Sequence, residues 1–409
     1  MSYLFTDNIG YKDGNLDAFG RLRSSSPTGI FDSQLQYDKQ PLLWEDLIVG
    51  SATSTHLPDE SAVDMSVTTA DGDSVIRQTY EYFRYQPGKS QLILLTTVFG
   101  TGQSGTTKLI GYGDDRDGIF VGQDGSGLFI LLRSSTSGIA SDVRKIYQTD
   151  WDLDTFDGNG NSKITLDPTK TQIIVIDLEW LGVGRVRVGF NIDGVTTYAH
   201  QFLNANRDQT KVYMKTANLP VRYEITNTQV VSNPATLKNI CSSVISEGGS
   251  EETLSYPFSE EMLGVSVPQG STVVFSTRMK STFGGQRNRA KFEPVGYETL
   301  ATGGKIITQL IYNGTVNGGT WVDVDDNSIM QINTTATGIT GGLKIGTSVI
   351  AGSAKNTISP AVGRSVSSRL PFGTGIAPDS DSGITLTLVA YSPDTNVTGD
   401  FTFQWEELR

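Results

Sequence analysis

The sequence predicts an all-β protein built from two β-sandwiches in succession. Nine Asp-Gly or Asn-Gly pairs punctuate its 409 residues, and these dipeptides supply the positive-φ positions that tight hairpin turns need. Apolar or alternating segments of strand length lie between the turns, and we find no long amphipathic helix in the sequence. Short helices are expected only around residues 41–47.

The first sandwich is predicted for residues 31–240. Residues 91–99 and 172–180 are continuous apolar runs, which are typical of strands covered on both faces. Residues 185–200 alternate polar and apolar side chains around an Asp-Gly pair, and residues 118–132 contain a second such turn, so each segment predicts a hairpin. Two hairpins and long buried strands over about 200 residues indicate a lectin-like (jelly-roll) β-sandwich, whose two sheets cover each other.

The rest of the chain divides into three further parts. Residues 1–30 are rich in glycine and polar side chains without periodicity, and we expect them to form an extended N-terminal arm. Residues 241–260 are polar and predict a linker. Residues 261–409 predict a smaller β-domain, and the strict alternation in residues 401–405 indicates that the last strand is held in a sheet.

Composition argues against several classes of function. The chain has two histidines and one cysteine, although these are the commonest general bases, nucleophiles and zinc ligands. We therefore expect no enzymatic activity. Cys241 alone cannot form an intrachain disulfide. The net charge of −12 argues against nucleic-acid binding, and no apolar run approaches the ~18 residues of a membrane span.

One acidic loop is a candidate metal site. Asp150, Asp152, Asp154 and Asp157 form the densest group of oxygen ligands in the sequence, and Ca²⁺ takes six to eight oxygens from such loops. Neither possible register matches an EF-hand, because the glycine and closing glutamate positions hold other residues. A polar turn is the alternative. We expect no cofactor, and a structural calcium ion stays an open alternative.

A basic island interrupts this acidic chain. Between residues 271 and 292 there are five basic residues and no acid. They are Arg278, Lys280, Arg287, Arg289 and Lys291. One interpretation is a solvated hairpin with Gly284-Gly285 at its tip. The other is a patch complementary to an acidic neighbour, which would fix orientation and register in an assembly.

Within the arm, Phe19, Arg21, Leu22 and Arg23 combine apolar and cationic groups that have no obvious local partner. They predict a docking peptide, with a frayed terminus as the alternative.

Pro87-Gly-Lys-Ser90 looks like the end of a phosphate-binding loop, but the earlier glycine of that motif is missing and a strand follows it. A turn is the better interpretation.

Six segments of the chain resemble a family of virion structural proteins of tailed bacteriophages, common among marine and cyanobacterial phages. The segments are residues 17–23, 31–34, 85–90, 179–187, 218–225 and 240–249. Each is weak alone, but their order over half of the chain is fairly specific. The resemblance implies a place in a particle, in its head or its tail, and no catalytic residues.

These observations predict a non-enzymatic virion subunit, made in the host cytoplasm and present in the assembled particle. We expect a homo-oligomer, with three copies as the leading number, in a fibre, vertex projection or tail-associated structure. Its partners would be itself and other virion proteins, which the arm would contact. The alternatives are a module that binds host-surface glycans and, ranked last, a polysaccharide depolymerase.

Overall fold

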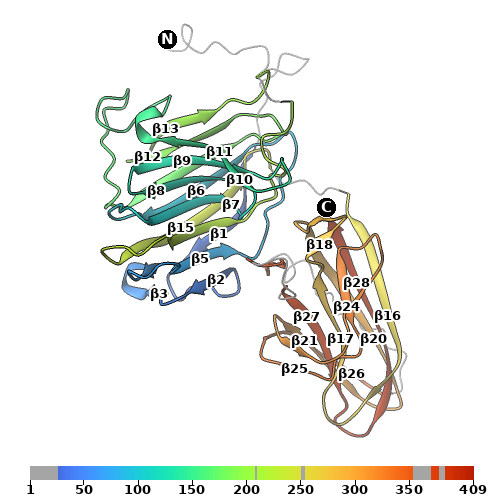
Figure 1. Ribbon diagram of the computed structural model, residues 1–409. Coiled ribbons are helices and arrows are strands. Elements are labelled where there is room, and N and C mark those ends of the chain that lie inside the picture. The colour runs from blue at the N-terminus through green and yellow to red at the C-terminus, as the bar shows by residue number, and fades with distance from the viewer. Residues whose placement is uncertain (1–25, 208–209, 250–253, 353–369, 377–382) are drawn as a thin grey trace, which may run out of the picture.

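The computed structural model describes residues 26–207, 210–249, 254–352, 370–376 and 383–409. Phe19, Arg21, Leu22 and Arg23 of the predicted docking peptide lie outside these ranges. The described chain consists of two β-sandwiches that follow each other in sequence and lie side by side (Figure 1). The predicted all-β fold class, a larger sandwich followed by a smaller one, is therefore confirmed.

The first sandwich pairs an eight-stranded with a seven-stranded antiparallel sheet. The larger sheet has the order β13-β12-β11-β6-β15-β4-β3, with β1 also paired to β15. Its strands are β1 (Thr28–Gln34), β3 (Thr53–Leu57), β4 (Ala62–Val67), β6 (Gln91–Val98), β11 (Gln172–Leu178), β12 (Val186–Ile192), β13 (Val195–Phe202) and β15 (Ala235–Ser246).

The other sheet has the order β10-β9-β8-β7-β14-β5-β2. Its strands are β2 (Trp44–Val49), β5 (Ser74–Thr79), β7 (Thr106–Gly113), β8 (Gly118–Asp124), β9 (Gly127–Ser134), β10 (Ser141–Tyr147) and β14 (Val221–Asn227). Two 3₁₀ turns, η2 (Pro58–Glu60) and η3 (Gln148–Asp150), connect strands.

Apolar side chains from both sheets fill the space between them. In β6, Ile93 and Leu95 are buried and point inward, as the two-residue period of a strand requires. Aromatic rings join the layers near one edge, where Phe31 contacts Trp44 and Phe83. This core, which extends over the whole sandwich, fixes the register of the strands, because a one-residue slip would expose it.

The second sandwich packs a three-stranded sheet against a six-stranded one. The small sheet has the order β16-β28-β20 and consists of β16 (Tyr256–Val267), β20 (Lys291–Thr302) and β28 (Val397–Leu408). The larger has the order β23-β24-β17-β27-β21-β26. Its strands are β17 (Thr272–Met279), β21 (Ile306–Tyr312), β23 (Val322–Asp323), β24 (Met330–Asn333), β26 (Leu343–Ile350) and β27 (Thr385–Tyr391). Two short ribbons complete it: β18 (Thr282–Phe283) with β19 (Gln286–Arg287), and β22 (Thr315–Asn317) with β25 (Gly338–Thr340).

The hairpins and the last strand predicted from the sequence are confirmed. Residues 118–132 form β8 and β9, and residues 185–200 form β12 and β13, with Asp193 and Gly194 both at positive φ in the turn. The last strand, β28, lies in the centre of its sheet. Its residues Phe401, Phe403 and Trp405 point into the core in alternation.

Four sequence-based predictions need correction. Residues 41–47 form a turn and then β2, since pairing of Trp44 with Thr79 overrides any local helical preference. The arm ends earlier than residue 30, because β1 begins at Thr28. The linker is shorter than 241–260, because β15 continues to Ser246 and β16 begins at Tyr256. Finally, β6 is buried on one face only, and its other face is half-buried.

None of the helical segments within the described ranges has the length and apolarity that a membrane span requires.

Candidate functional site: a buried ion cluster between the two sandwiches

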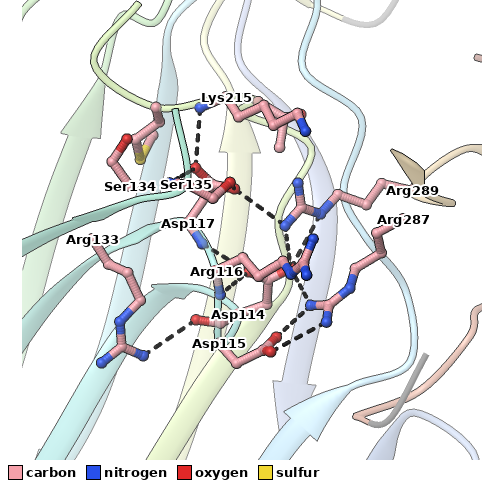
Figure 2. Close-up of polar contacts among 12 residues, drawn as sticks. Asp114, Asp115, Arg116, Asp117, Arg133, Ser134, Ser135, Lys215, Arg287 and Arg289 are labelled. Atoms are coloured by element: carbon pink, nitrogen blue, oxygen red, sulfur yellow. Dashed lines mark hydrogen bonds and ion pairs between the residues drawn. The ribbon is translucent and has the colours of Figure 1, made fainter. Parts of the chain in front are cut away.

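A group of opposite charges joins the two sandwiches. The acids lie on the loop between β7 and β8, at residues 114–117, and the bases lie on β19 and directly after it. The β18–β19 ribbon turns at Gly284 and Gly285, which both have positive φ, so a tight hairpin presents Arg287 and Arg289 to the first sandwich (Figure 2).

Asp114 is the centre of the cluster. Its Oδ1 accepts hydrogen bonds from the backbone N–H groups of Arg116 and Asp117, which closes the loop on itself. Its Oδ2 accepts from Arg289 Nη2 at 2.5 Å and Nε at 3.1 Å, and from Arg287 Nη1 at 3.1 Å. The Asp114 side chain is 1% exposed, so both oxygens are satisfied inside the protein.

Two further acids complete the arrangement. Asp115, at the rim, binds Arg287 through both carboxylate oxygens. Asp117 is fully buried and accepts from the backbone N–H groups of Ser135 and Lys215, each at 3.0 Å. Its second oxygen accepts from Ser135 Oγ at 2.7 Å and lies 3.4 Å from Arg289 Nη2. The cluster thus ties three loops of the first sandwich to one hairpin of the second.

The electrostatics favour the charged forms of the groups. Burial alone would raise the pKa of Asp114, but the guanidinium groups of Arg289 and Arg287 hold it below its ordinary value. Burial likewise opposes the charge of Arg289, and Asp114 and Asp117 raise its pKa. Burial raises the pKa of Tyr82, which lies beside the cluster and stays neutral. Removing one partner would leave the other as an uncompensated buried charge.

Apolar and backbone contacts extend this interface. Leu42 and Tyr80 of the first sandwich pack against the core of the second. Gly373 lies so close to Tyr80 that a Cβ there would come within 1.8 Å of the Tyr80 carbonyl oxygen. Glu45 Oε2 accepts a hydrogen bond of 2.6 Å from Ile376 N–H. The two cores and the ion cluster therefore hold the sandwiches together at several separate points.

The predicted basic island is divided by the structure. Arg287 and Arg289 are buried against the first sandwich, with side chains 6% and 10% exposed, so a fully solvated hairpin is wrong for them. Their acidic neighbour is a loop of the same chain. Lys291 pairs with Glu293 at 2.9 Å and reaches Glu81 at 3.9 Å.

The other two members of the island lie elsewhere on the second sandwich. Arg278 stacks on the Trp321 ring at 4.2 Å and donates to Gln331 at 3.0 Å. Lys280 pairs with Asp323 at 3.0 Å. The island is therefore not one continuous surface.

The four candidate calcium ligands are not brought together in the described structure. Asp154 is buried and accepts from the backbone N–H groups of Phe156 and Ser162. Asp157 accepts from the Thr155 hydroxyl and the Asn159 N–H. Within the described ranges, no group of three or more His, Cys, Asp or Glu side chains is placed to hold a metal ion. The polar-turn alternative fits this geometry.

The remaining two candidates, Asp152 and Asp150, have different surroundings. Asp152 Oδ1 lies 2.9 Å from His200 Nδ1 and accepts from Gln201 N–H. Burial lowers the pKa of His200, and Asp152 opposes that effect. Asp150 ends the short turn η3. The histidine thus has a structural hydrogen-bond partner on the sandwich surface.

The sequence did not identify Asp114, Asp115 and Asp117 as partners of the basic island. A signal was present, because the acidic run Asp-Asp-Arg-Asp at 114–117 ends in Asp117-Gly118, one of the nine Asp-Gly or Asn-Gly pairs. Asp115 and Arg287 are 172 positions apart in the sequence, and only the docking of the two sandwiches brings the two groups together.

No protein-family model matches this chain, and no curated protein matches it. Solved structures of similar fold include the CBM2 module of evolved Dit from Lactobacillus casei BL23 phage J-1. That module is 7% identical, with 56% of this chain and 100% of the module covered at a TM-score of 0.36.

Two other similar structures are a plant lectin and a phage enzyme. Peanut lectin is 8% identical, with coverage of 54% and 98% and a TM-score of 0.34. A carbohydrate esterase from the Shiga toxin-encoding bacteriophage phi24B is 8% identical, with coverage of 54% and 100% and a TM-score of 0.33. At these TM-scores and identities, the likenesses carry no inference about the function of this chain.

Proposed function

We propose that this chain is a non-enzymatic structural subunit of a tailed-phage virion, homo-oligomeric in the particle and expected to be a trimer. The observation that carries the proposal is the buried ion cluster around Asp114 and Arg289. It makes two sandwiches into one body with a defined mutual orientation.

A fixed orientation is what a projecting or load-transmitting subunit needs. Interfaces between domains of one chain are commonly polar and allow relative motion. Here Asp114, Asp117 and Arg289 are buried and contact one another, and contacts between the two cores flank them. Burying charge contributes little net stability, but a buried pair penalises every orientation that separates its members. We therefore propose that the ion cluster fixes the orientation of the two sandwiches relative to each other.

The six sequence segments that resemble phage virion proteins support the same proposal. Arm residues Phe19, Arg21, Leu22 and Arg23 would contact another virion protein, which fits their mixture of apolar and cationic groups. The proposed location is the assembled particle, as part of a fibre, a vertex projection or a tail-associated structure.

Reconstitution of particles tests the proposal. Wild-type chain and the Arg289→Ala variant are supplied to a phage strain that lacks the gene, and purified particles are analysed by mass spectrometry and cryo-electron microscopy. We expect the wild-type chain at symmetric positions in the particle and the variant at reduced occupancy. Lys170→Ala, which removes an exposed charge on the loop before β11, is the matched control. Particles that never contain the wild-type chain would refute a virion role.

A glycan-binding function is the second candidate, and one observation favours it. Trp321 lies partly exposed on Arg278, and Gln331 joins Arg278 to Asp323 through hydrogen bonds of 3.0 Å each. An aromatic ring beside ordered planar polar groups is suited to a sugar ring. Loss of glycan-array binding in Trp321→Ala, with binding kept in Val349→Ala, would support it. No binding by the wild-type chain would count against it.

The depolymerase alternative is favoured by no specific observation in the described residues.

A further inference from the structure

An exposed apolar patch lies at one end of the first sandwich. Leu181, Val183, Leu203 and Val212 are 52%, 42%, 41% and 38% exposed. The turn between β11 and β12 brings them together. Gly182 O accepts from Tyr213 N–H at 3.0 Å, and Gly184 O accepts from Asn204 Nδ2 at 2.7 Å. We call these four side chains the apolar patch. Clustered exposed aliphatic groups of this kind mark contact surfaces.

The turn that carries the patch is built to hold this shape. Leu181 and Gly182 both have positive φ. A Cβ at Gly184 would lie 1.9 Å from the Glu179 carbonyl oxygen, so only glycine fits there. Gly184 N–H donates to Trp180 O at 2.7 Å. The patch is therefore a fixed part of the surface.

A polar pocket of about 270 Å³ borders the patch. Leu181 lines it together with residues 88–90, Asp177, Glu179, Arg185, Arg187 and Glu247. Asp177 is already bound by Arg187 and by the Tyr198 hydroxyl. Among the described residues, neither Glu179 nor Arg185 has a side-chain ion pair, and both are exposed. One negative and one positive group thus flank the apolar patch.

The N-terminal arm enters the sandwich beside this pocket. Thr28 pairs with Ser246, and a Cβ on Gly249 would lie 3.6 Å from the carbonyl oxygen of Ser26. Lys89, in the pocket wall, donates to Gly249 O at 3.2 Å. The first described residue, Ser26, therefore lies at the rim of the pocket.

Chain length limits how far the docking peptide can lie from the patch. A fully extended chain spans at most about 3.3–3.6 Å per residue, so Arg23 lies within roughly 10 Å of Ser26 and Phe19 within roughly 25 Å. The apolar and charged side chains of residues 17–23 are thus tethered next to a surface that exposes the same kinds of groups.

We propose that residues 17–23 dock on the apolar patch of their own chain in the free subunit. Phe19 and Leu22 cover Leu181, Val183 and Val212. Arg21 or Arg23 pairs with Glu179, and Asp17 pairs with Arg185. The short tether gives the arm a high effective concentration at this surface, so assembly would exchange this contact for one with a neighbouring virion protein.

Hydrogen exchange in the full-length chain tests the proposal. The amides of residues 181–185 are followed by mass spectrometry in the wild-type chain and in Phe19→Ser/Leu22→Ser. Loss of docking should speed their exchange about tenfold. Leu4→Ser/Phe5→Ser makes the same chemical change in the same arm beyond the docking peptide, and should leave these rates unchanged. Equal rates in all three chains would overturn the proposal.

Two further measurements sharpen the result. Glu179→Arg should speed the same exchange. Adding Arg21→Glu and Arg23→Glu to the Glu179→Arg chain reverses both sides of the ion pair and should restore the slow exchange of the wild-type chain. A lack of rescue would exclude the ion pair. The exchange is also measured at several protein concentrations, and light scattering reports the oligomeric state at each. If the slow exchange of residues 181–185 were lost on dilution, the arm would dock on another copy, which would overturn the same-chain assignment. All these readouts use purified protein, so their failure is distinguishable from failure to find the chain in particles.

Discussion

Asp114 and Arg289 form an ion pair of 2.5 Å between two sandwiches, although 175 residues of sequence separate them. Asp114 lies on the loop between β7 and β8, and Arg289 lies between β19 and β20. Their contact is buried and shared with Asp117 and Arg287. The pair therefore reports directly on whether the two sandwiches hold one orientation.

Removing the positive partner should destabilise the protein strongly. Arg289→Met leaves Asp114 buried without its main counter-charge, and we expect the free energy of unfolding to fall by about 3–5 kcal/mol. Chemical denaturation measures this change. The exposed Lys170→Met should stay within about 0.5 kcal/mol of the wild-type chain. The paired replacement Asp114→Asn/Arg289→Met should recover part of the loss, because the buried negative charge is then absent while an amide oxygen can still accept from the N–H groups of Arg116 and Asp117.

The ion cluster should respond to pH only in acid. The pKa of Asp114 lies below its ordinary value of 3.8 in the folded chain, since burial is outweighed by Arg289 and Arg287. A carboxyl of this kind stabilises the fold above its unfolded pKa, and the contribution is lost as the pH falls through the folded pKa. The stability difference between wild type and Arg289→Met should therefore be largest where Asp114 is ionised in both folded chains, and it should shrink as the pH falls through the higher pKa that Asp114 has in the variant. A difference that grew as the pH fell would contradict this assignment.

Close backbone approach at the interface should make Gly373 irreplaceable. A Cβ there meets the Tyr80 carbonyl oxygen at 1.8 Å, so Gly373→Ala must push the two sandwiches apart locally. We expect a loss of about 1–3 kcal/mol in unfolding free energy. Gly270→Ala is the control, because a Cβ there has nothing within 4 Å. Similar stability in both variants would argue against close packing at Tyr80.

The buried lysine of the first sandwich should titrate at unusually low pH. Lys108 donates to Thr101 O and Gln123 Oε1 at 3.1 Å each, and also to Phe99 O. Burial lowers its pKa to about 8. Because the unfolded chain binds the proton more tightly, the free energy of unfolding should rise between about pH 8 and 10. NMR titration of the Lys108 ammonium tests this, and a midpoint near 10.5 would contradict it.

Local patterns in the sequence were enough to predict the fold class. Asp193-Gly194 and Asp124-Gly125 marked the two hairpins correctly, since turn chemistry depends on neighbouring residues alone. Trp44 shows the limit of such patterns, because its strand exists through pairing with Thr79, which is distant in sequence. The polar end of β15, from Cys241 onward, has the composition of a linker, and its pairing with β1 and β6 makes it a strand.

The candidate site was less predictable than the fold. The basic island was visible as composition, and its need for an acidic neighbour followed from charge. Which acids would meet Arg289 depended on how two finished sandwiches dock, and no local pattern encodes that. The same holds for the apolar patch, because Leu181 and Val212 become neighbours only after the sandwich has formed.

The most direct test of a rigid two-sandwich body is a distance distribution between them. Spin labels at Val195→Cys and Val349→Cys, both exposed and one in each sandwich, are introduced with Cys241→Ser and measured by pulsed electron resonance. We predict one narrow distance in the wild-type background and a broad distribution in Arg287→Ala/Arg289→Ala. A broad distribution in the wild-type background, or a narrow one in both, would contradict the orienting role of the ion cluster.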